Sequence, residues 1–244
     1  MKTLIIIPSR LAATRLPGKP LLKINGLSII SHVFKKAEKA KIGDVVVATE
    51  NQEIVDDVKT NGGQAVLTSN KHNTGTDRIY EALQKIKISN IDLVMNLQGD
   101  EPLIDIDDIR NLNQLMINTN SKIGTLASKI IDIKLYGNQN VVKVKTKEEL
   151  NQKNFPEAVD FKRKTLKKDL NTYHHIGVYC YEMGTLKDFV SYKQSLNEAK
   201  YKLEQLRALE NKIKINVALA RSHSIGIDTK EDFVAIKKIM EYKA

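Results

Sequence analysis

Three cations gather in a short loop near the amino end of the chain. Arg10, Arg15 and Lys19 occur, with Gly18 among them, directly after the apolar run 4–7, which has the length and β-branched content of a buried parallel strand. Guanidinium groups grip phosphate oxygens in a forked geometry, and a lysine supplies a point charge that can follow a phosphate as its bonds change. The loop therefore predicts a site for a ligand with several negative charges, and a triphosphate fits.

Two aspartates follow strand-like segments and are candidates to hold a metal ion. Asp100 stands in Leu-Gln-Gly-Asp-Glu-Pro after the apolar run 91–97, and Asp228 stands in Ile-Asp-Thr-Lys-Glu-Asp. Magnesium takes one or two carboxylates and completes its shell with phosphate and water. Alone, Asp100 would by default cap a turn. Thr229 and Asp232 have the spacing of a helix N-cap, so their presence needs no functional explanation. Asp228 is not needed for that cap and remains a candidate metal ligand.

The elements that must position these residues alternate along the first hundred residues. Strands are expected at 4–7, 45–48, 65–67 and 91–97, and helices at 28–41, about 52–60 and 76–86. Short connections of this kind imply right-handed crossovers and a mainly parallel sheet in three layers, α/β/α, whose ligands bind at the carboxyl ends of the strands.

The alternation changes beyond Asp100. We expect a helix at 106–116, strands at 123–131 and 141–144, a strand at 176–181, a helix at 197–210, a strand at 213–220 and a terminal helix from 231. The polar, lysine-rich stretch 145–171 interrupts this order, which predicts a small antiparallel insertion or lid at about 121–173. The whole chain, 1–244, is expected to form a single domain around it.

Composition bounds the class of protein. Of 244 residues 41% are hydrophobic, which suffices for a substantial core. No run approaches the roughly 18 apolar residues of a membrane span, and 4–7 is too short for a signal peptide, so we expect a cytoplasmic protein without membrane insertion. The single cysteine, Cys180, lies in an alternating apolar run and is expected to fill the core.

The net charge of +10 raises the question of nucleic-acid binding. Much of the excess is lysine spread along helical faces, and 5% aromatic residues offer few stacking platforms. The lysine-rich cluster 162–168 is interpreted as a solvated loop or edge strand rather than a polynucleotide site. No nucleic-acid partner is expected, although the positive field would favour small anionic substrates.

The cationic loop matches neither common glycine-rich phosphate loop, because both Gly-x-x-x-x-Gly-Lys-Ser/Thr and Gly-x-Gly-x-x-Gly are absent from it. The loop sequence, Arg-x-x-x-Thr-Arg-Leu-Pro-Gly-Lys-Pro-Leu, resembles the signature loop of the sugar nucleotidyltransferases that make CMP-activated sugar acids. Within them it is most similar to the CMP-Kdo synthetase (3-deoxy-manno-octulosonate cytidylyltransferase) family. On the loop alone, a basic surface turn remains the alternative.

The resemblance implies a nucleotidyltransferase fold, CTP as a substrate and Mg²⁺ held by Asp100 and Asp228. The segment 72–78 is similar to the family's Ser-Gly-Thr-Asp/Glu-Arg element beside the cytosine, although Thr76 with Asp77 is equally a plain helix cap. The implied nucleotide site comprises Pro8, Arg10, Arg15, Lys19, Thr74, Gly75, Thr76, Arg78 and Gln98. Lys19, Arg10 and Asp100 are the implied catalytic residues.

The resemblance also implies a sugar-acid site. His-His-Ile-Gly-Val-Tyr at 174–179 resembles the family's His-x-Gly-x-Tyr, and Glu-Gln-Leu-Arg at 204–207 matches a helical element of the family. The implied contacts are Gln98, Arg163, His175, Tyr179, Glu204 and Gln205. A lone histidine on a strand is more often structural, and a zinc site is rejected because no second matched ligand accompanies it.

Three departures from the family pattern leave the acceptor open. The usual Ser-Arg-x-x-Ile-Pro element of the insertion is replaced around Arg163, Ala13 replaces a common serine, and Lys230 stands where proline is usual. The nucleotide chemistry is unaffected by these changes. An 8-amino derivative of Kdo or a nine-carbon acid therefore stays possible as the acceptor.

The implied reaction joins CTP to Kdo, giving CMP-Kdo and pyrophosphate for lipopolysaccharide synthesis, by in-line attack of the anomeric hydroxyl on the α-phosphate in a homodimeric enzyme. Two other classes are weighed against it. A nicotinamide-dependent dehydrogenase should carry the dinucleotide glycine fingerprint, which this chain lacks. A basic nucleic-acid-binding protein should bind oligonucleotides with a steep salt dependence and turn over no CTP.

Overall fold

The structure is a computed structural model that describes residues 1–12, 15–165, 170–221 and 226–242. The described chain forms two compact units. The N-terminal unit comprises Lys2–Ile109 with the described part of Ser224–Ala244, and the central unit comprises the described part of Arg110–His223. Each unit is described separately below.

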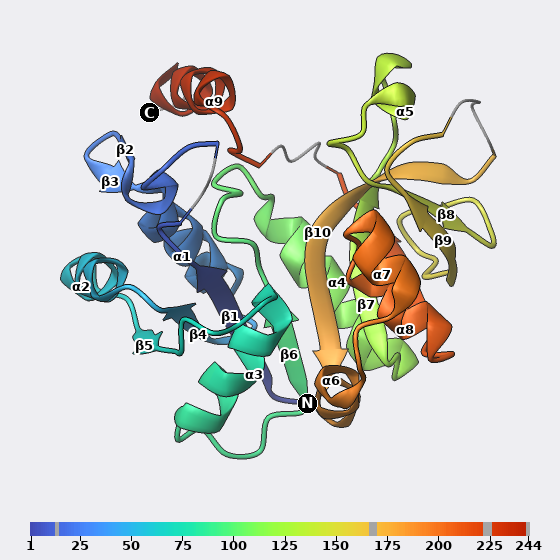
Figure 1. The fold of residues 1–244 in the computed structure, drawn as a ribbon, viewed down its shortest axis with the longest axis horizontal. Coiled ribbons are helices and arrows are strands. Elements are labelled where there is room, and N and C mark those ends of the chain that lie inside the picture. Colours follow the sequence, from blue (N-terminus) through green and yellow to red (C-terminus); the bar gives the residue numbers. More distant parts are fainter. Residues whose placement is uncertain (13–14, 166–169, 222–225, 243–244) are drawn as a thin grey trace. The chain divides into compact units, whose positions relative to one another are not determined.

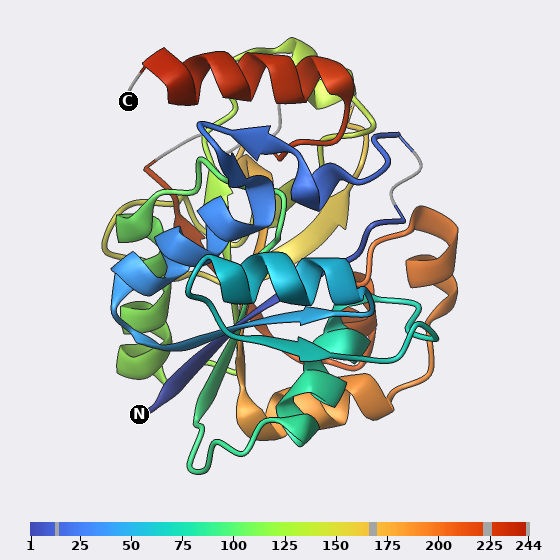
Figure 2. The same ribbon diagram turned by 90° about the vertical axis from the view of Figure 1, so that its left-hand side faces the viewer.

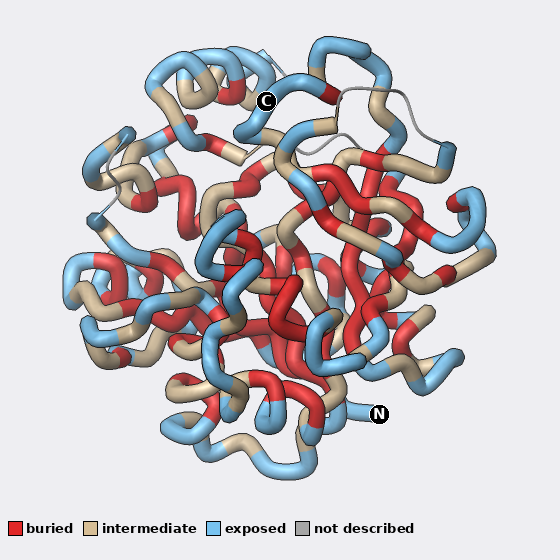
Figure 3. Tube along the Cα trace, turned by 45° about the vertical axis from the view of Figure 1, so that its right-hand side comes forward, coloured by how far each residue is buried: buried red, intermediate tan, exposed pale blue. Residues whose placement is uncertain are grey.

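The N-terminal unit is built on four parallel strands in the order β6-β1-β4-β5 (Figure 1). Their bounds are Thr3–Ser9 for β1, Gly43–Thr49 for β4, Ala65–Leu67 for β5 and Leu93–Asn96 for β6. Leu4, Ile5, Ile6 and Ile7 are each 0% exposed, as expected of a strand covered on both faces. Figure 3 shows how buried positions concentrate along the strands. The predicted strands and their parallel arrangement are confirmed.

Three helices cover this sheet. Their bounds are Ile29–Ala40 for α1, Gln52–Thr60 for α2 and Gly75–Lys85 for α3. The sheet order places α1 and α2 on one face, because both crossovers step outward from β1, and places α3 on the other face, because it returns the chain to β6 (Figures 1 and 2). The three layers predicted from the sequence are thereby confirmed for this unit.

One glycine is required by the approach of two strands. A Cβ atom at Gly43 would lie 1.8 Å from the carbonyl oxygen of Thr3, far inside any tolerated contact. Gly43 is paired with Thr3 at the start of the β1–β4 ladder. The absence of a side chain there lets β4 begin in register with the strand that leads to the cationic loop.

The carboxyl-terminal helix α9, Lys230–Tyr242, belongs to the same unit. Its Ile236, together with Ile227, packs with Ile24 and Ile29 in a buried apolar cluster. Ile24 lies in a short hairpin that the sequence did not predict, β2 Lys23–Ile24 paired with β3 Leu27–Ser28. This cluster fixes the end of the chain beside the segment that follows the cationic loop.

The central unit contains a mixed sheet. Its strands are β7 Ile123–Ser128, β8 Lys143–Thr146, β9 Ala158–Lys162, β10 Thr172–Glu182 and β11 Ile215–Leu219. β11 is parallel to β7, whereas β7–β10, β10–β8 and β8–β9 are antiparallel. The antiparallel insertion is therefore confirmed, although β8 begins two residues later than the strand predicted at 141–144.

The helices of the central unit differ from the prediction at one important place. They are most of α4 Ile106–Thr119, then α5 Lys134–Gly137, α6 Met183–Ser191, α7 Leu196–Tyr201 and α8 Gln205–Glu210. The single helix predicted at 197–210 is wrong, because Lys202 adopts a left-handed backbone (φ 54°) that ends α7 before α8 begins. The short helix α5 and the helix α6 were not predicted.

Two further expectations concern burial and membranes. Cys180 is fully buried on β10, and burial raises the pKa of its thiol, as expected for a core residue. Among the helices of the described ranges, none combines the length and apolar character that crossing a bilayer requires.

Candidate active site

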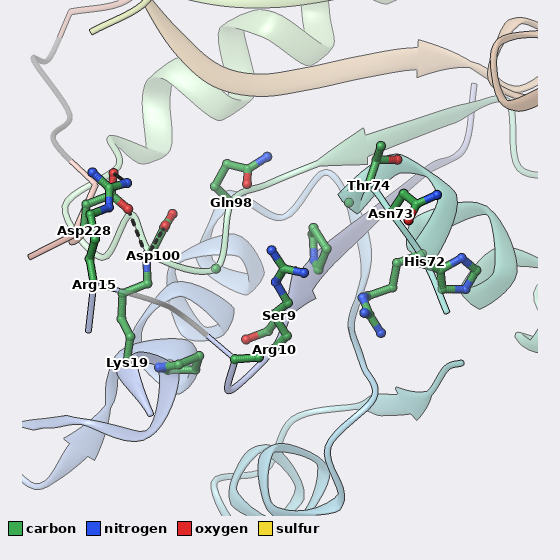
Figure 4. A pocket seen from close by; sticks show the side chains of 16 residues that line it. Ser9, Arg10, Arg15, Lys19, His72, Asn73, Thr74, Gln98, Asp100 and Asp228 are labelled. Atoms are coloured by element: carbon green, nitrogen blue, oxygen red, sulfur yellow. Dashed lines mark hydrogen bonds and ion pairs between the residues drawn. The ribbon is translucent and has the colours of Figure 1, made fainter. Parts of the chain in front are cut away.

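A cavity of about 400 Å³ opens in the N-terminal unit, a size suited to a nucleotide (Figure 4). The loops that follow β1 and β6 and the segment that enters α3 line it, at the carboxyl ends of the parallel strands. Its lining residues are Pro8, Ser9, Arg10, Ala12, Arg15, Lys19, Pro20, His72, Asn73, Thr74, Gly75, Arg78, Gln98, Gly99, Asp100 and Asp228. The predicted nucleotide residues, except Thr76, are therefore brought together.

The cationic loop is held by its own backbone. Gly18 adopts a left-handed conformation (φ 69°) that favours glycine, and Lys19–Leu21 follows as one turn of 3₁₀ helix. The amide of Gly18 donates to the carbonyl of Leu11 (3.3 Å), whose own amide donates to the side chain of Asn51 (2.9 Å). The loop thus folds back on itself, and Lys19 leaves it pointing into the cavity (Figure 4).

Lys19 joins the two predicted metal ligands. Its ammonium lies 2.6 Å from Oδ2 of Asp100 and 3.4 Å from Oδ1 of Asp228, and Arg15 lies 2.9 Å from Oδ2 of Asp228 (Figure 4). A backbone hydrogen bond from Ile227 to the carbonyl of Asp100 (2.9 Å) ties the two acidic segments together. Two carboxylates from distant parts of the chain therefore converge on one cationic group.

This donor set fits magnesium. Hard carboxylate oxygens are the ligands that Mg²⁺ prefers, and one or two suffice when phosphate and water complete the shell. No group of three or more acidic, histidine or cysteine side chains that could cage a metal occurs among the described residues. The carboxylate of Asp228 takes no part in the cap of α9, in which Asp232 accepts from the amides of Asp228 and Thr229 and the hydroxyl of Thr229 accepts from the amide of Asp232.

Gly99 brings the strand-end turn of Asp100 close to the cationic loop. A Cβ atom at Gly99 would lie 3.1 Å from the carbonyl oxygen of Pro8 and 3.0 Å from the side chain of Ile30. Such contacts are tighter than those of most Cβ atoms. The glycine therefore allows Asp100 to approach the loop after β1.

The segment before α3 differs in detail from the prediction. Thr74, and not Thr76, is the N-cap, since its hydroxyl accepts from the amide of Asp77 (3.1 Å). Thr76 is buried (1% exposed) and is not among the cavity-lining residues. The amide groups at the start of α3 remain the feature of this segment suited to a polar base edge.

Arg78 lines the cavity but its guanidinium is engaged elsewhere. It donates to the hydroxyl of Thr68 (2.6 Å) and the carbonyl of Ser69 (3.2 Å), and it pairs with Glu50. Arg78 is only 3% exposed. These contacts indicate that it holds the wall of the cavity in place.

Sequence reasoning included His72 and Asn73 in the base segment 72–78 without naming them as contacts, and it did not single out Ser9 as a lining residue. His72 is anchored by Glu81, which also accepts from the amide of Ser69 and from Lys85 (2.6 Å). Burial alone would raise the pKa of Glu81, but the bonds from Lys85, His72 and Ser69 lower that pKa to about 2. The available signal was position, because His72 and Asn73 directly precede the predicted helix start.

The remaining predicted sugar-acid residues, apart from Gln98, lie in the central unit. His175 on β10 is buried, and its Nε2 lies 2.9 Å from the hydroxyl of Thr125. That hydroxyl donates to the carbonyl of Val178 (2.7 Å), so Nε2 of His175 carries the proton of their mutual bond. Burial, with a smaller effect of the adjacent His174, lowers the pKa of His175 to about 3, which makes the ring neutral at physiological pH.

Tyr179 offers a buried hydroxyl without a hydrogen-bond partner among the described residues. Its ring lies 5.4 Å from that of His175. Burial raises the pKa of Tyr179 well above its usual value, and Tyr181 and the nearby Glu204 add to the effect. A buried hydroxyl without a partner is a group to which a polar ligand can bond.

Glu204 and Gln205 stand at the junction between α7 and α8. Arg207 fixes this junction through a bidentate pair with Glu198 (2.8 and 2.5 Å), and its guanidinium lies 4.8 Å from the centre of the Phe189 ring. Both side chains of the pair are at most 5% exposed. The Arg of Glu-Gln-Leu-Arg is therefore structural.

Arg163 does not present a free guanidinium. It donates to the carbonyls of Tyr201 (2.9 Å), Lys202 (2.9 Å) and Gln139 (3.3 Å). The neighbouring residues 166–169 of the predicted lysine cluster lie outside the described residues, as does Ala13 of the cationic loop.

Comparison with known proteins agrees with the geometry of the cavity. A family model described as "Cytidylyltransferase" matches residues 4–215. A 3-deoxy-manno-octulosonate cytidylyltransferase from Thermodesulfovibrio yellowstonii is 43% identical over an alignment of 251 residues that covers 98% of each chain. One from Rhodopseudomonas palustris is 43% identical over 243 residues, covering 99% of this chain and 98% of the relative.

A solved structure gives the same result. The structure titled as CMP:2-keto-3-deoxy-manno-octonic acid synthetase complexed with CTP superposes with a TM-score of 0.88 at 32% identity, and all of both chains is covered. The fold class expected from the sequence is thereby confirmed. The chain belongs to the cytidylyltransferase family, in the branch of the 3-deoxy-manno-octulosonate cytidylyltransferases.

Proposed function

We propose that this protein couples CTP to Kdo, giving CMP-Kdo and pyrophosphate. The observation that carries the proposal is the convergence of Asp100 and Asp228 on Lys19 beneath a loop with two further cations. A triphosphate with its metal ion needs this pairing of positive and negative groups in one cavity. The names of the relatives supply the nucleotide and the acceptor.

In the nucleotide site, Arg10 and Arg15 bind phosphate oxygens, and the polar segment from His72 to Gly75 receives the base. Asp100 and Asp228 hold Mg²⁺, which when bound neutralises phosphate charge and orients the triphosphate. Lys19 exchanges its carboxylate partners for the α-phosphate, where it stabilises the charge that grows during attack. Gln98, which follows β6, lines the cavity.

The acceptor is bound by His175, Tyr179, Glu204 and Gln205. Thr125 holds the neutral ring of His175 in place, and the Tyr179 hydroxyl and the Glu204 carboxylate bond sugar hydroxyls. The anomeric oxygen forms the new bond to the α-phosphorus, the bond from that phosphorus to pyrophosphate breaks, and the hydroxyl proton passes to solvent. Positioning and charge neutralisation are sufficient for such an in-line transfer, so no covalent enzyme intermediate is formed.

The setting of this reaction is part of the proposal. CTP is a cytoplasmic metabolite, so we place the enzyme in the cytoplasm. We place the contact of a homodimer on the insertion at about 121–173, where Ile131 and Ile133 are more than 70% exposed. Kdo is preferred over an 8-amino or nine-carbon acid because of the names of the full-length relatives.

The test is pyrophosphate release from each of the four ribonucleoside triphosphates, with and without Kdo and Mg²⁺. Release only with CTP, Kdo and Mg²⁺ together is expected. Release with CTP and another sugar acid would correct the acceptor. Absence of release with any acid, together with salt-dependent binding of oligonucleotides, would overturn the proposal in favour of a nucleic-acid-binding protein.

A further inference from the structure

Two cationic side chains of the central unit, Lys143 and Arg163, donate hydrogen bonds to main-chain carbonyl oxygens. Lys143 on β8 is 2% exposed, and its ammonium donates to the carbonyls of Asn138 (2.6 Å), Arg163 (2.7 Å) and Val141 (2.8 Å). An ammonium has three donors, so its hydrogen-bonding capacity is filled. Burial lowers the pKa of Lys143 to about 8, which shows the cost of keeping this cation inside. A buried lysine held in this way fixes the chain around it.

Arg163 continues the same network. Lys143 holds its carbonyl, while its guanidinium donates to the carbonyls of Tyr201, Lys202 and Gln139. Tyr201 is the last residue of α7 and Lys202 is its left-handed cap, so their carbonyls are those that a helix end leaves without intrahelical partners. A cation at this end also opposes the negative end of the helix dipole.

The segment that Arg163 holds leads directly into the acceptor residues. Only Leu203, buried in the core, separates the cap at Lys202 from Glu204. On the other side, Arg163 follows β9, whose Phe161 packs edge-on against the ring of His175 with centroids 5.1 Å apart. Lys143 itself is paired in the β8–β10 ladder with His174. The network therefore touches the neighbours of both Glu204 and His175.

We propose that Arg163 and Lys143 are positioning residues that set Glu204 against His175 and Tyr179, and that Arg163 does not bind the carboxylate of the acceptor. The inference rests on the proposed function, since it assigns these residues to the acceptor site of that reaction. It replaces the direct contact with the sugar acid that the family resemblance implies for Arg163.

The closing experiment separates positioning from direct contact with two inhibitors. One is Kdo without its anomeric hydroxyl, which cannot react, and the other is the carboxamide of the same compound. Inhibition constants against Kdo are measured for the wild type, Arg163→Gln, Lys143→Met and Lys162→Gln. Lys162 neighbours Arg163, and its ammonium pairs with Asp160 in an exposed contact, so Lys162→Gln is the matched control for loss of a charge.

Arg163→Gln and Lys143→Met should each weaken both inhibitors by the same factor, about 10-fold to 100-fold for loss of charge-assisted hydrogen bonds. The KM for Kdo should rise similarly, and the KM for CTP should stay unchanged. If Arg163→Gln weakens the acid but leaves the carboxamide unaffected, Arg163 binds the carboxylate and the inference is wrong. Unchanged constants in Lys143→Met would also overturn it.

Hydrogen–deuterium exchange gives a readout without ligands. Amides 201–206 should exchange faster in Arg163→Gln than in the wild type and in Lys162→Gln, and equal exchange would contradict the positioning role. Should Lys143→Met fail to fold, the inhibition constants and the hydrogen–deuterium exchange are measured on Arg163→Gln and Arg163→Lys instead. Absence of turnover with Kdo in the wild type would refute the proposed function, whereas turnover with unchanged exchange would refute only this inference.

Discussion

Replacement of Lys19 by methionine separates the chemical role of this residue from its structural one. The substitution keeps most of the side-chain volume and removes the charge that lies 2.6 Å from Asp100 and 3.4 Å from Asp228. Lys19 is 12% exposed in its side chain, but Asp100 and Asp228 are 30% and 49% exposed. Solvent screens such contacts, so the free energy of unfolding should fall by about 1 kcal/mol or less.

The effect on turnover should be much larger. A donor aimed at charge that develops in the transition state is typically worth about 10²–10³ in kcat, which corresponds to about 2.7–4 kcal/mol. The KM for CTP should change less, because Arg10 and Arg15 remain to bind the phosphates. Loss of Lys19 also removes the one cation that contacts both carboxylates and leaves only Arg15 beside Asp228, so Mn²⁺ should bind the nucleotide-free variant more tightly than the wild type.

The assay is pyrophosphate release at saturating CTP and Kdo, together with urea unfolding of the same preparations. Lys23→Met is the matched control, because Lys23 is exposed on the β2 hairpin of the same unit and loses the same charge. Lys23→Met should retain wild-type kcat. A folded Lys19→Met protein with near-full turnover would refute the assignment of Lys19 to the transition state.

Three further outcomes follow from the geometry. Gly18→Ala forces a left-handed backbone (φ 69°) onto a residue with a side chain, so urea unfolding should show a loss of about 1–2 kcal/mol even though the added Cβ meets no neighbour. Glu198→Gln removes the carboxylate that pairs with buried Arg207 and leaves it only Glu204, 4.0 Å away, so a loss of about 3–5 kcal/mol is expected in the same assay, with no loss contradicting the buried pair. Because the pKa of His175 is lowered to about 3 in the folded protein, the imidazole is protonated in the unfolded chain but not in the folded protein between pH 3 and about 6.5. Stability should therefore fall by about 1.4 kcal/mol per pH unit from pH ~6.5 toward 3 because of this group, and His175→Gln should lack that part of the slope.

The sequence is most informative where local pattern and tertiary role coincide. The apolar run 4–7 could only be a buried strand, and the helices after it carry their apolar stripes at helical spacing, so the parallel sheet of the N-terminal unit could be predicted. Asp228 could be separated from the helix cap because Thr229 and Asp232 already satisfy that cap. The chemistry of the cavity was therefore accessible from residue types and their order.

Other features depend on contacts that the sequence does not encode locally. The helix predicted at 197–210 is interrupted at Lys202, which adopts a left-handed backbone although it is neither glycine nor asparagine. Arg163 donates to the carbonyls of Tyr201 and Lys202 at this break. The helix α6 begins at the unusual cap Glu182, whose carboxylate accepts from Gly184 and Thr185. These arrangements are set by tertiary partners, and periodicity alone could not reveal them.

The central claim is that Asp100 and Asp228 hold one metal ion on the triphosphate of CTP. Titration of Mn²⁺ in place of Mg²⁺, followed by electron paramagnetic resonance at saturating CTP, tests it directly in the wild type, Asp100→Asn, Asp228→Asn and Asp232→Asn. Each of the first two substitutions should weaken Mn²⁺ binding at least about tenfold, as expected for loss of a charged ligand. Asp232→Asn removes an acidic charge of the same segment, whose side chain contacts the backbone amides of Asp228 and Thr229, and it should bind as the wild type does because the carboxylate of Asp228 is kept. Wild-type affinity in either Asp100→Asn or Asp228→Asn would contradict the shared metal site.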